Sequence, residues 1–167
     1  MKPSTQATDY IDFIKSRPGA DLRGDAEKEA VARFRGFLEN LHPEGIRERT
    51  RKVYSDDAYL NDTLKTVRGA AAIEHYFLET AGNTDEIRVE VVDVARSGDE
   101  YYFRWVMDVK FKKFHRGRSF RTIGMTHARF NDDGKAILHQ DYWDSTAGFF
   151  EHVPVLGSGI RWIKSKI

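Results

Sequence analysis

The chain has 167 residues, of which 40% are hydrophobic and 32% charged, and this balance predicts one globular domain and excludes a disordered chain. Its 27 Lys and Arg residues balance its 26 Asp and Glu residues, so the net charge of +1 gives no electrostatic reason to expect a nucleic-acid partner. The absence of cysteine excludes disulfides, zinc–thiolate sites, iron–sulfur clusters and a cysteine nucleophile.

Residues 1–24 are predicted to form a loose N-terminal arm, and residues 25–167 a single domain. Pro18-Gly19 interrupts any helix in the arm, although a short turn over residues 10–14 would dock its apolar side chains. No stretch holds the ~20 apolar residues of a membrane span, and residues 1–20 lack the apolar centre of a signal peptide. We therefore expect no membrane span and a cytoplasmic location.

Three helices are predicted in the first half of the domain. Apolar residues recur at helical spacing over 25–41, where Asp25 suits the N-terminal cap. A second, basic helix is expected over 43–54, and a third from Gly69 to Gly82.

Two short extended pieces lie between the second and third helices. Ser55-Asp56-Asp57 has turn chemistry, and residues 58–60 and 64–68 are expected to pair as small strands.

Four longer strands follow, because the apolar period changes to two from Ile87 onward. Val92 and Val94 shift the phase, which predicts a bulge of the kind that curved sheets need. Apolar residues then occupy every second position from Tyr101 to Phe111, which predicts a long, half-buried strand.

Hairpin turns are expected at 115–118 and 131–134, and strands at 120–130 and 135–144. Helical spacing returns over 146–167, broken by Pro154 and by Gly157-Ser158-Gly159. The basic and apolar segment 160–167 suits a helix over the mouth of a pocket, or contact with an anionic membrane surface.

This order of elements predicts the α+β class: a curved antiparallel sheet wrapped around N-terminal helices, which cover its apolar face. Long bulged strands curl, so sheet and helices together would form a cone with an opening.

Several segments in this order resemble the SnoaL-like branch of the NTF2-like superfamily. They are residues 53–57 and 61–62 (VYSDD, ND), residues 67–69 with Ile73 and Tyr76-Phe77, residues 129–131 with 134–135, and above all residues 139–144 (HQDYWD). The resemblance covers roughly residues 27–150 and implies the cone-shaped fold. The superfamily includes ketosteroid isomerases, polyketide cyclases, epoxide hydrolases and binding domains without catalysis, so the resemblance selects no activity.

The last predicted strand holds the densest set of reactive residues. His139, Asp141 and Trp143 share one of its faces, and Asp144 lies on the other. Asp141 would be desolvated beside tryptophan on a concave face, and could then serve as a general base or acid. Resemblance to the polyketide cyclases favours Asp144 instead, because their catalytic acid lies at the end of the equivalent strand. Alternatively, one Asp pairs with an arginine and the other caps the next helix.

His127 on the preceding strand is a third candidate catalytic residue, as a proton shuttle or a partner for a carboxylate, or else a satisfied core histidine. Asp62 follows a short strand that points toward the pocket in the family pattern, although a turn role fits equally well.

Aromatic residues make up 13% of the chain, which suits a core that encloses a cavity and also a plainly filled core. The candidate substrate-binding residues, with the His139 and Asp62 already named, are Tyr54, Tyr59, Trp105 and Trp143. The tyrosine hydroxyls could donate to a carbonyl or an oxyanion.

No GxGxxG, P-loop, HExxH or tight His/Asp cluster is present, so we expect no cofactor and no metal. The Tyr–Asp pair of the steroid isomerases and the Asp–Arg–Asp relay of the epoxide hydrolases cannot be assigned at matching positions.

Three functions remain open. The first is a domain that binds an apolar small molecule without transforming it. The second is a cofactor-independent isomerase, cyclase or epoxide hydrolase with an Asp general base, and the third is a protein-interaction adaptor. A homodimer through the sheet is expected from the family resemblance.

Overall fold

The computed structural model describes residues 5–112, 119–145, 150 and 156–166. Its helices are α1 (Thr5–Ser16), α2 (Gly24–Leu38), α3 (Pro43–Val53), α4 (Ala70–Gly82) and α6 (Leu156–Lys164). Its strands are β1 (Tyr54–Asn61), β2 (Thr66–Arg68), β3 (Thr84–Ser97), β4 (Glu100–Phe111), β5 (Phe120–Phe130) and β6 (Ala136–Trp143).

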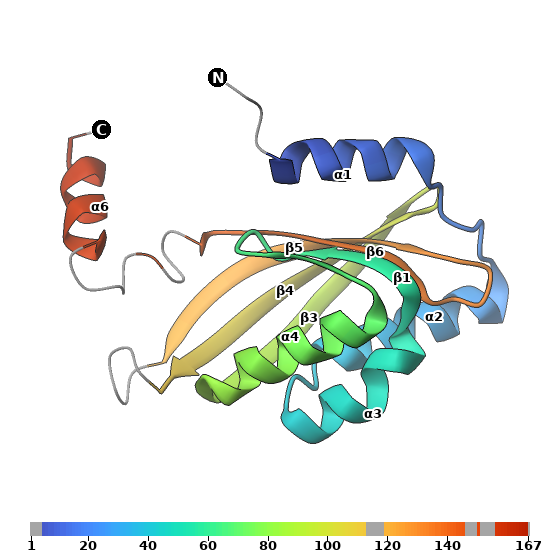
Figure 1. Cartoon of the computed structure of the whole chain (residues 1–167), viewed down its shortest axis with the longest axis horizontal. Helices are drawn as coiled ribbons and strands as arrows, with labels where there is room; N and C mark the ends of the chain where they lie inside the picture. Colours follow the sequence, from blue (N-terminus) through green and yellow to red (C-terminus); the bar gives the residue numbers. More distant parts are fainter. Residues whose placement is uncertain (1–4, 113–118, 146–149, 151–155, 167) are drawn as a thin grey trace.

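The strands form one bent sheet in the order β2-β1-β6-β5-β4-β3. Helix α1 lies over one face of this sheet, and α2, α3 and α4 lie against the other (Figure 1). The predicted α+β class and helical cover are therefore confirmed. The sheet is mixed rather than wholly antiparallel, because β1 pairs with β6 in parallel. The long stretch of chain between these two strands allows a parallel pairing, which a tight turn would not.

The alternation along β4 places Tyr101, Phe103 and Trp105 in the main core, together with apolar residues of α2 and α4. The predicted bulge is also present, since the β3–β4 register shifts between Val91 and Asp93. An extra residue in one strand increases its bend, so the bulge helps the sheet curve around the helices.

Ser55-Asp56-Asp57, expected as a turn, instead lies within β1. The register between β1 and β6 shifts between Tyr54 and Tyr59, so this stretch is an irregular part of the strand. Its turn-forming residues fit there because the Ser55 hydroxyl donates to Asp57 Oδ1 at 2.9 Å.

The segment expected as a loose arm contains the helix α1, which ends before Pro18-Gly19. Tyr10, Phe13 and Ile14 share one face of this helix and pack against a second cluster that includes Tyr59 and Ile137. This i, i+3, i+4 spacing is that of an amphipathic helix, and a short turn would not use all three side chains.

Helix α6 runs through Gly157-Ser158-Gly159, where the sequence predicts a break, and stands apart from the sheet in Figure 1. Its Trp162 and Ile163 side chains are 65% and 53% exposed. The expected hairpin at 115–118 and the break at Pro154 lie outside the described residues. None of the helices in the described part of the chain is long and apolar enough to cross a membrane.

Candidate functional site

A cavity of about 180 Å³ lies between α4 and the inner face of the sheet, with the end of α2 as part of its wall. Its lining is mainly aliphatic and aromatic: Leu38, Leu41, Leu64, Tyr76, Phe77, Ile87, Val89, Trp105, Met107, Val109, Phe111 and Trp143. The polar lining residues are Asp62, Thr80, Thr84, Thr126, His139 and Asp141. Apolar walls with a few converging polar groups are typical of small-molecule sites.

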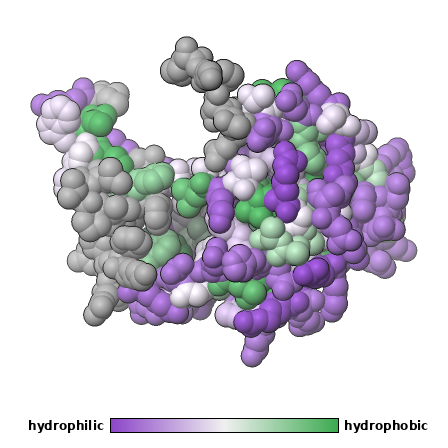
Figure 2. All heavy atoms as spheres, in the orientation of Figure 1, coloured by the Kyte–Doolittle hydropathy of each residue, from purple (hydrophilic) through white to green (hydrophobic). Residues whose placement is uncertain are grey.

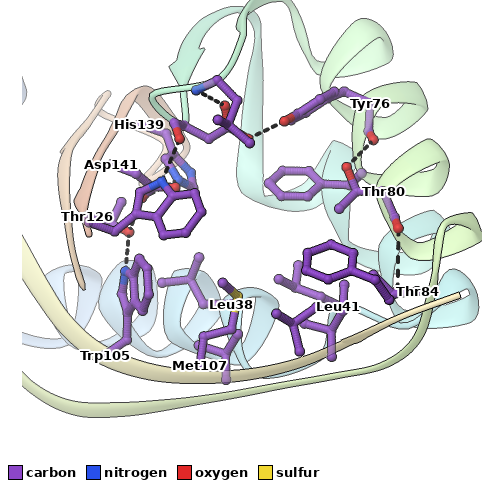
Figure 3. A pocket seen from close by; sticks show the side chains of 18 residues that line it. Leu38, Leu41, Tyr76, Thr80, Thr84, Trp105, Met107, Thr126, His139 and Asp141 are labelled. Carbon is purple, nitrogen blue, oxygen red and sulfur yellow. Dashed lines mark hydrogen bonds and ion pairs between the residues drawn. The ribbon is translucent and has the colours of Figure 1, made fainter. Parts of the chain in front are cut away.

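Asp141 is the polar group at the centre of one wall (Figure 3). Its Oδ1 accepts the Thr126 hydroxyl at 2.5 Å and contacts His139 Nε2 at 3.0 Å. Thr126 in turn accepts the indole N–H of Trp105 at 2.9 Å. No described residue makes a hydrogen bond to the other carboxylate oxygen, Asp141 Oδ2.

His139 connects Asp141 to the core. It is 1% exposed, and its Nδ1 lies 2.7 Å from the hydroxyl of Tyr54, which is fully buried. Burial raises the pKa of Tyr54 well above its ordinary value, and the charge of Asp141 adds to this effect, so the hydroxyl keeps its proton.

The buried Tyr54 hydroxyl makes no other hydrogen bond to a described residue, so it donates to His139 Nδ1. The other ring nitrogen, Nε2, then donates to Asp141. The Tyr54–His139–Asp141 chain therefore orients the carboxylate.

A second carboxyl group, Asp62, faces the cavity from the turn after β1. Its Oδ1 accepts the backbone N–H groups of Leu64 and Lys65 at 3.0 and 2.9 Å, and its Oδ2 accepts the Tyr76 hydroxyl of α4. Burial raises the pKa of Asp62 and outweighs these hydrogen bonds, and the charge of Asp141 raises it further. The Trp143 indole donates to the Asp62 backbone carbonyl at 2.7 Å and so joins β6 to this turn.

Gly124 on β5 leaves the space that the two tryptophans occupy. A Cβ at this position would overlap the six-membered ring of Trp105 and come within 2.8 Å of the Trp143 Cβ atom. Only glycine therefore fits opposite these residues, with which it pairs in the sheet.

The structure brings together five of the residues that the sequence singles out: Asp62, Trp105, His139, Asp141 and Trp143 all line the cavity. Tyr54 lies behind them, in contact with His139. Asp144 follows the end of β6, is exposed, and is not among the lining residues.

His127 and Tyr59 lie on the other side of the sheet, beneath α1. His127 contacts the Tyr10 hydroxyl at 3.0 Å through Nδ1, and Glu100 through Nε2. Tyr59 packs against Phe13 with 5.4 Å between ring centroids. The strand alternation explains the first placement, because the neighbouring Thr126 points into the cavity and His127 must point away.

Tyr76, Thr126 and Gly124 are site residues that the sequence reasoning missed as such. Tyr76 could have been identified from the sequence, since it belongs to a segment that carries the family resemblance. Thr126 and Gly124 could not, because their roles depend on the registers of β5 with β4 and β6. Among the described residues, no group of three or more His, Asp or Glu side chains is placed to hold a metal ion.

Solved structures with similar folds have little sequence similarity to the chain. An LEH-like epoxide hydrolase of M. tuberculosis is 14% identical, with 83% of this chain and 94% of that one covered and a TM-score of 0.62. A hypothetical protein with a ketosteroid isomerase-like fold from Catenulispora acidiphila, solved with trimethylamine, is 17% identical over 72% and 88%, with a TM-score of 0.61. An NTF2-like protein of unknown function from Exiguobacterium is 18% identical over 69% and 98%, with a TM-score of 0.59.

These likenesses establish an NTF2-like fold and no activity. No curated protein matches the sequence. The family model of the SnoaL-like domain matches residues 31–139, which span α2 to the middle of β6 and include Tyr54, Asp62, Tyr76 and Trp105. The chain therefore belongs to the SnoaL-like domain family.

Proposed function

We propose that the cavity binds an apolar small molecule whose polar end contacts Asp141. One observation carries this proposal: a mainly apolar cavity of about 180 Å³ contains an oriented carboxylate with one oxygen that no described residue engages. A filled core would enclose neither the space nor the unpaired acceptor.

Tryptophan fluorescence tests this binding directly, because Trp105 and Trp143 line the cavity. The exposed Trp162 is removed from the signal by Trp162→Phe. A panel of apolar ketones, alcohols, epoxides and amines is titrated into this variant. Amines belong in the panel because the Catenulispora protein was solved with trimethylamine. Saturable quenching is expected, and its absence with every class would contradict the proposal.

A second function, cofactor-independent proton transfer, is supported by the same Asp141 oxygen, which no described residue engages. A carboxylate that is fixed by His139 and Thr126 and faces an apolar space suits a general base. Tyr76, whose hydroxyl donates to Asp62, lines the same cavity and could instead donate a hydrogen bond to the substrate.

Deuterium exchange beside the carbonyl of an apolar ketone such as 1-indanone tests proton abstraction, and hydrolysis of styrene oxide tests epoxide opening. Asp141→Asn should abolish either activity, while Asp132→Asn, at an exposed turn position, is the matched control. Loss with Asp144→Asn but not with Asp141→Asn would overturn the assignment of the base.

An adaptor function has less support. Hydrophilic side chains dominate the face shown in Figure 2, with small hydrophobic areas between them. The face of the sheet that points away from the cavity carries the ion pairs Arg104–Asp93 and Arg121–Asp108. Ile123 is exposed on the same sheet. We retain the homodimer through this sheet as a prediction, and light scattering at micromolar concentration tests it.

A further inference from the structure

The charges inside the cavity are unbalanced. Among the residues that the structure describes, the ionisable ones that line it are Asp62, Tyr76, His139 and Asp141, with no Lys or Arg. His139 places one ring nitrogen against Asp141 and the other against the buried Tyr54 hydroxyl. Lys65, the nearest cation to Asp62 in sequence, directs its Nζ over the Tyr76 ring at 5.2 Å and lies 4.0 Å from Glu79.

Asp62 and Asp141 differ in what they offer a ligand. Both oxygens of Asp62 already accept hydrogen bonds, from two backbone amides and from Tyr76. Asp141 Oδ2 has no hydrogen-bond partner among the described residues, and the Asp141 side chain is 16% exposed. A carboxylate this far removed from water lacks full hydration, and a cation beside it would restore the lost stabilisation.

The walls around Asp141 suit the same kind of group. Trp105 comes from β4 and Trp143 from β6, and Tyr76 and Phe77 of α4 also line the cavity. Figure 3 shows Trp105 and Tyr76 on different sides of it. Aromatic faces attract ammonium groups through the ring quadrupole, and desolvation strengthens this attraction.

We propose that the ligand of this cavity is an amine: an apolar body that carries an ammonium group, which donates to Asp141 Oδ2 and lies among the aromatic side chains. This inference rests on the proposed small-molecule binding and narrows its ligand class. Asp62 contributes negative charge when ionised and makes no direct contact with the ammonium group.

The experiment compares three compounds with one carbon skeleton: 3-phenylpropylamine, 3-phenylpropanol and 3-phenylpropionate. Calorimetric titration at pH 7 should give an affinity for the amine at least tenfold above that for the alcohol, and weaker binding still for the carboxylate. Asp141→Asn should reduce the amine affinity about tenfold or more and change the alcohol affinity less than threefold. Asp132→Asn is the matched control and should change neither.

The outcomes separate the two proposals. Equal affinity for the amine and the alcohol, or an amine affinity that Asp141→Asn leaves unchanged, would overturn the amine assignment and leave small-molecule binding in place. No binding of any of the three compounds, together with no fluorescence response to the wider panel, would overturn both. Circular dichroism of each variant shows that a loss of affinity does not come from a loss of fold.

Discussion

Replacing Tyr54 with phenylalanine tests whether the buried hydrogen bond to His139 holds the site together. The substitution removes one hydroxyl and keeps the ring, which packs against Phe34 and Phe37. It leaves His139 Nδ1 without a donor, in a side chain that is 1% exposed. An unsatisfied buried polar group costs about 1–3 kcal/mol, so we expect a loss of that size in the free energy of unfolding.

Urea denaturation measures this loss as a lower midpoint with an unchanged m value. In thermal unfolding, each 1 kcal/mol corresponds to a decrease of about 2–4 °C in Tm for a chain of this size. The matched control is Tyr101→Phe, because Tyr101 is also buried but its hydroxyl lies 3.4 Å from Glu27. We expect the control to cost less than about 0.5 kcal/mol.

Two results would refute the reasoning. Equal losses in the two variants would mean that the Tyr54 hydroxyl contributes nothing beyond an ordinary core tyrosine. An intact ligand affinity in a destabilised Tyr54→Phe protein would mean that His139 does not orient Asp141.

Two further predictions concern the packing of Trp105 and Trp143 against Gly124 and the outer face of the sheet. Gly124→Ala should cost about 1–3 kcal/mol through overpacking against Trp105 and shift the tryptophan emission, whereas Gly82→Ala, which meets no atom within 4 Å, should do neither. Wild-type emission and stability in Gly124→Ala would contradict the close approach. Burial alone would raise the pKa of Glu100, but hydrogen bonds from Arg129 and His127 outweigh it and lower the pKa. The stability that Glu100 supplies is therefore present above the unfolded pKa of about 4.3 and is lost as pH falls through the lower folded value. Glu100→Gln should therefore weaken the pH dependence of the urea midpoint between about pH 5 and pH 3. Parallel pH profiles of variant and wild type would count against this contribution.

The elements of the inner face were predictable because their burial is periodic. The alternation of β4 and the phase shift at the β3 bulge both appear directly in the residue order. The parallel pairing of β1 with β6 was not predictable, because no local pattern records which distant strands become neighbours. The helix in the N-terminal segment was missed because only three residues of one face are apolar, and their partners lie more than forty positions away.

For the site, strand parity groups His139, Asp141 and Trp143 on one face, but the sequence leaves open whether that face points inward. The fold places this face against the cavity and Asp144 outside it. The contact between Asp62 and Tyr76 was likewise invisible, since it depends on how α4 lies across the turn after β1.

The parallel contact between β1 and β6 also bears on the order in which the protein folds. Tyr54 and His139 are 85 residues apart, and Asp62 and Trp143 are 81 apart. Contacts of such long sequence separation form late, because the entropy of closing the loop is lost before any contact compensates for it. During synthesis, Tyr54 and Asp62 both emerge before their partners on β6 exist. The cavity wall is therefore completed only when the last strand docks, and a chain that stops short of it has most of its helices without His139, Asp141 and Trp143.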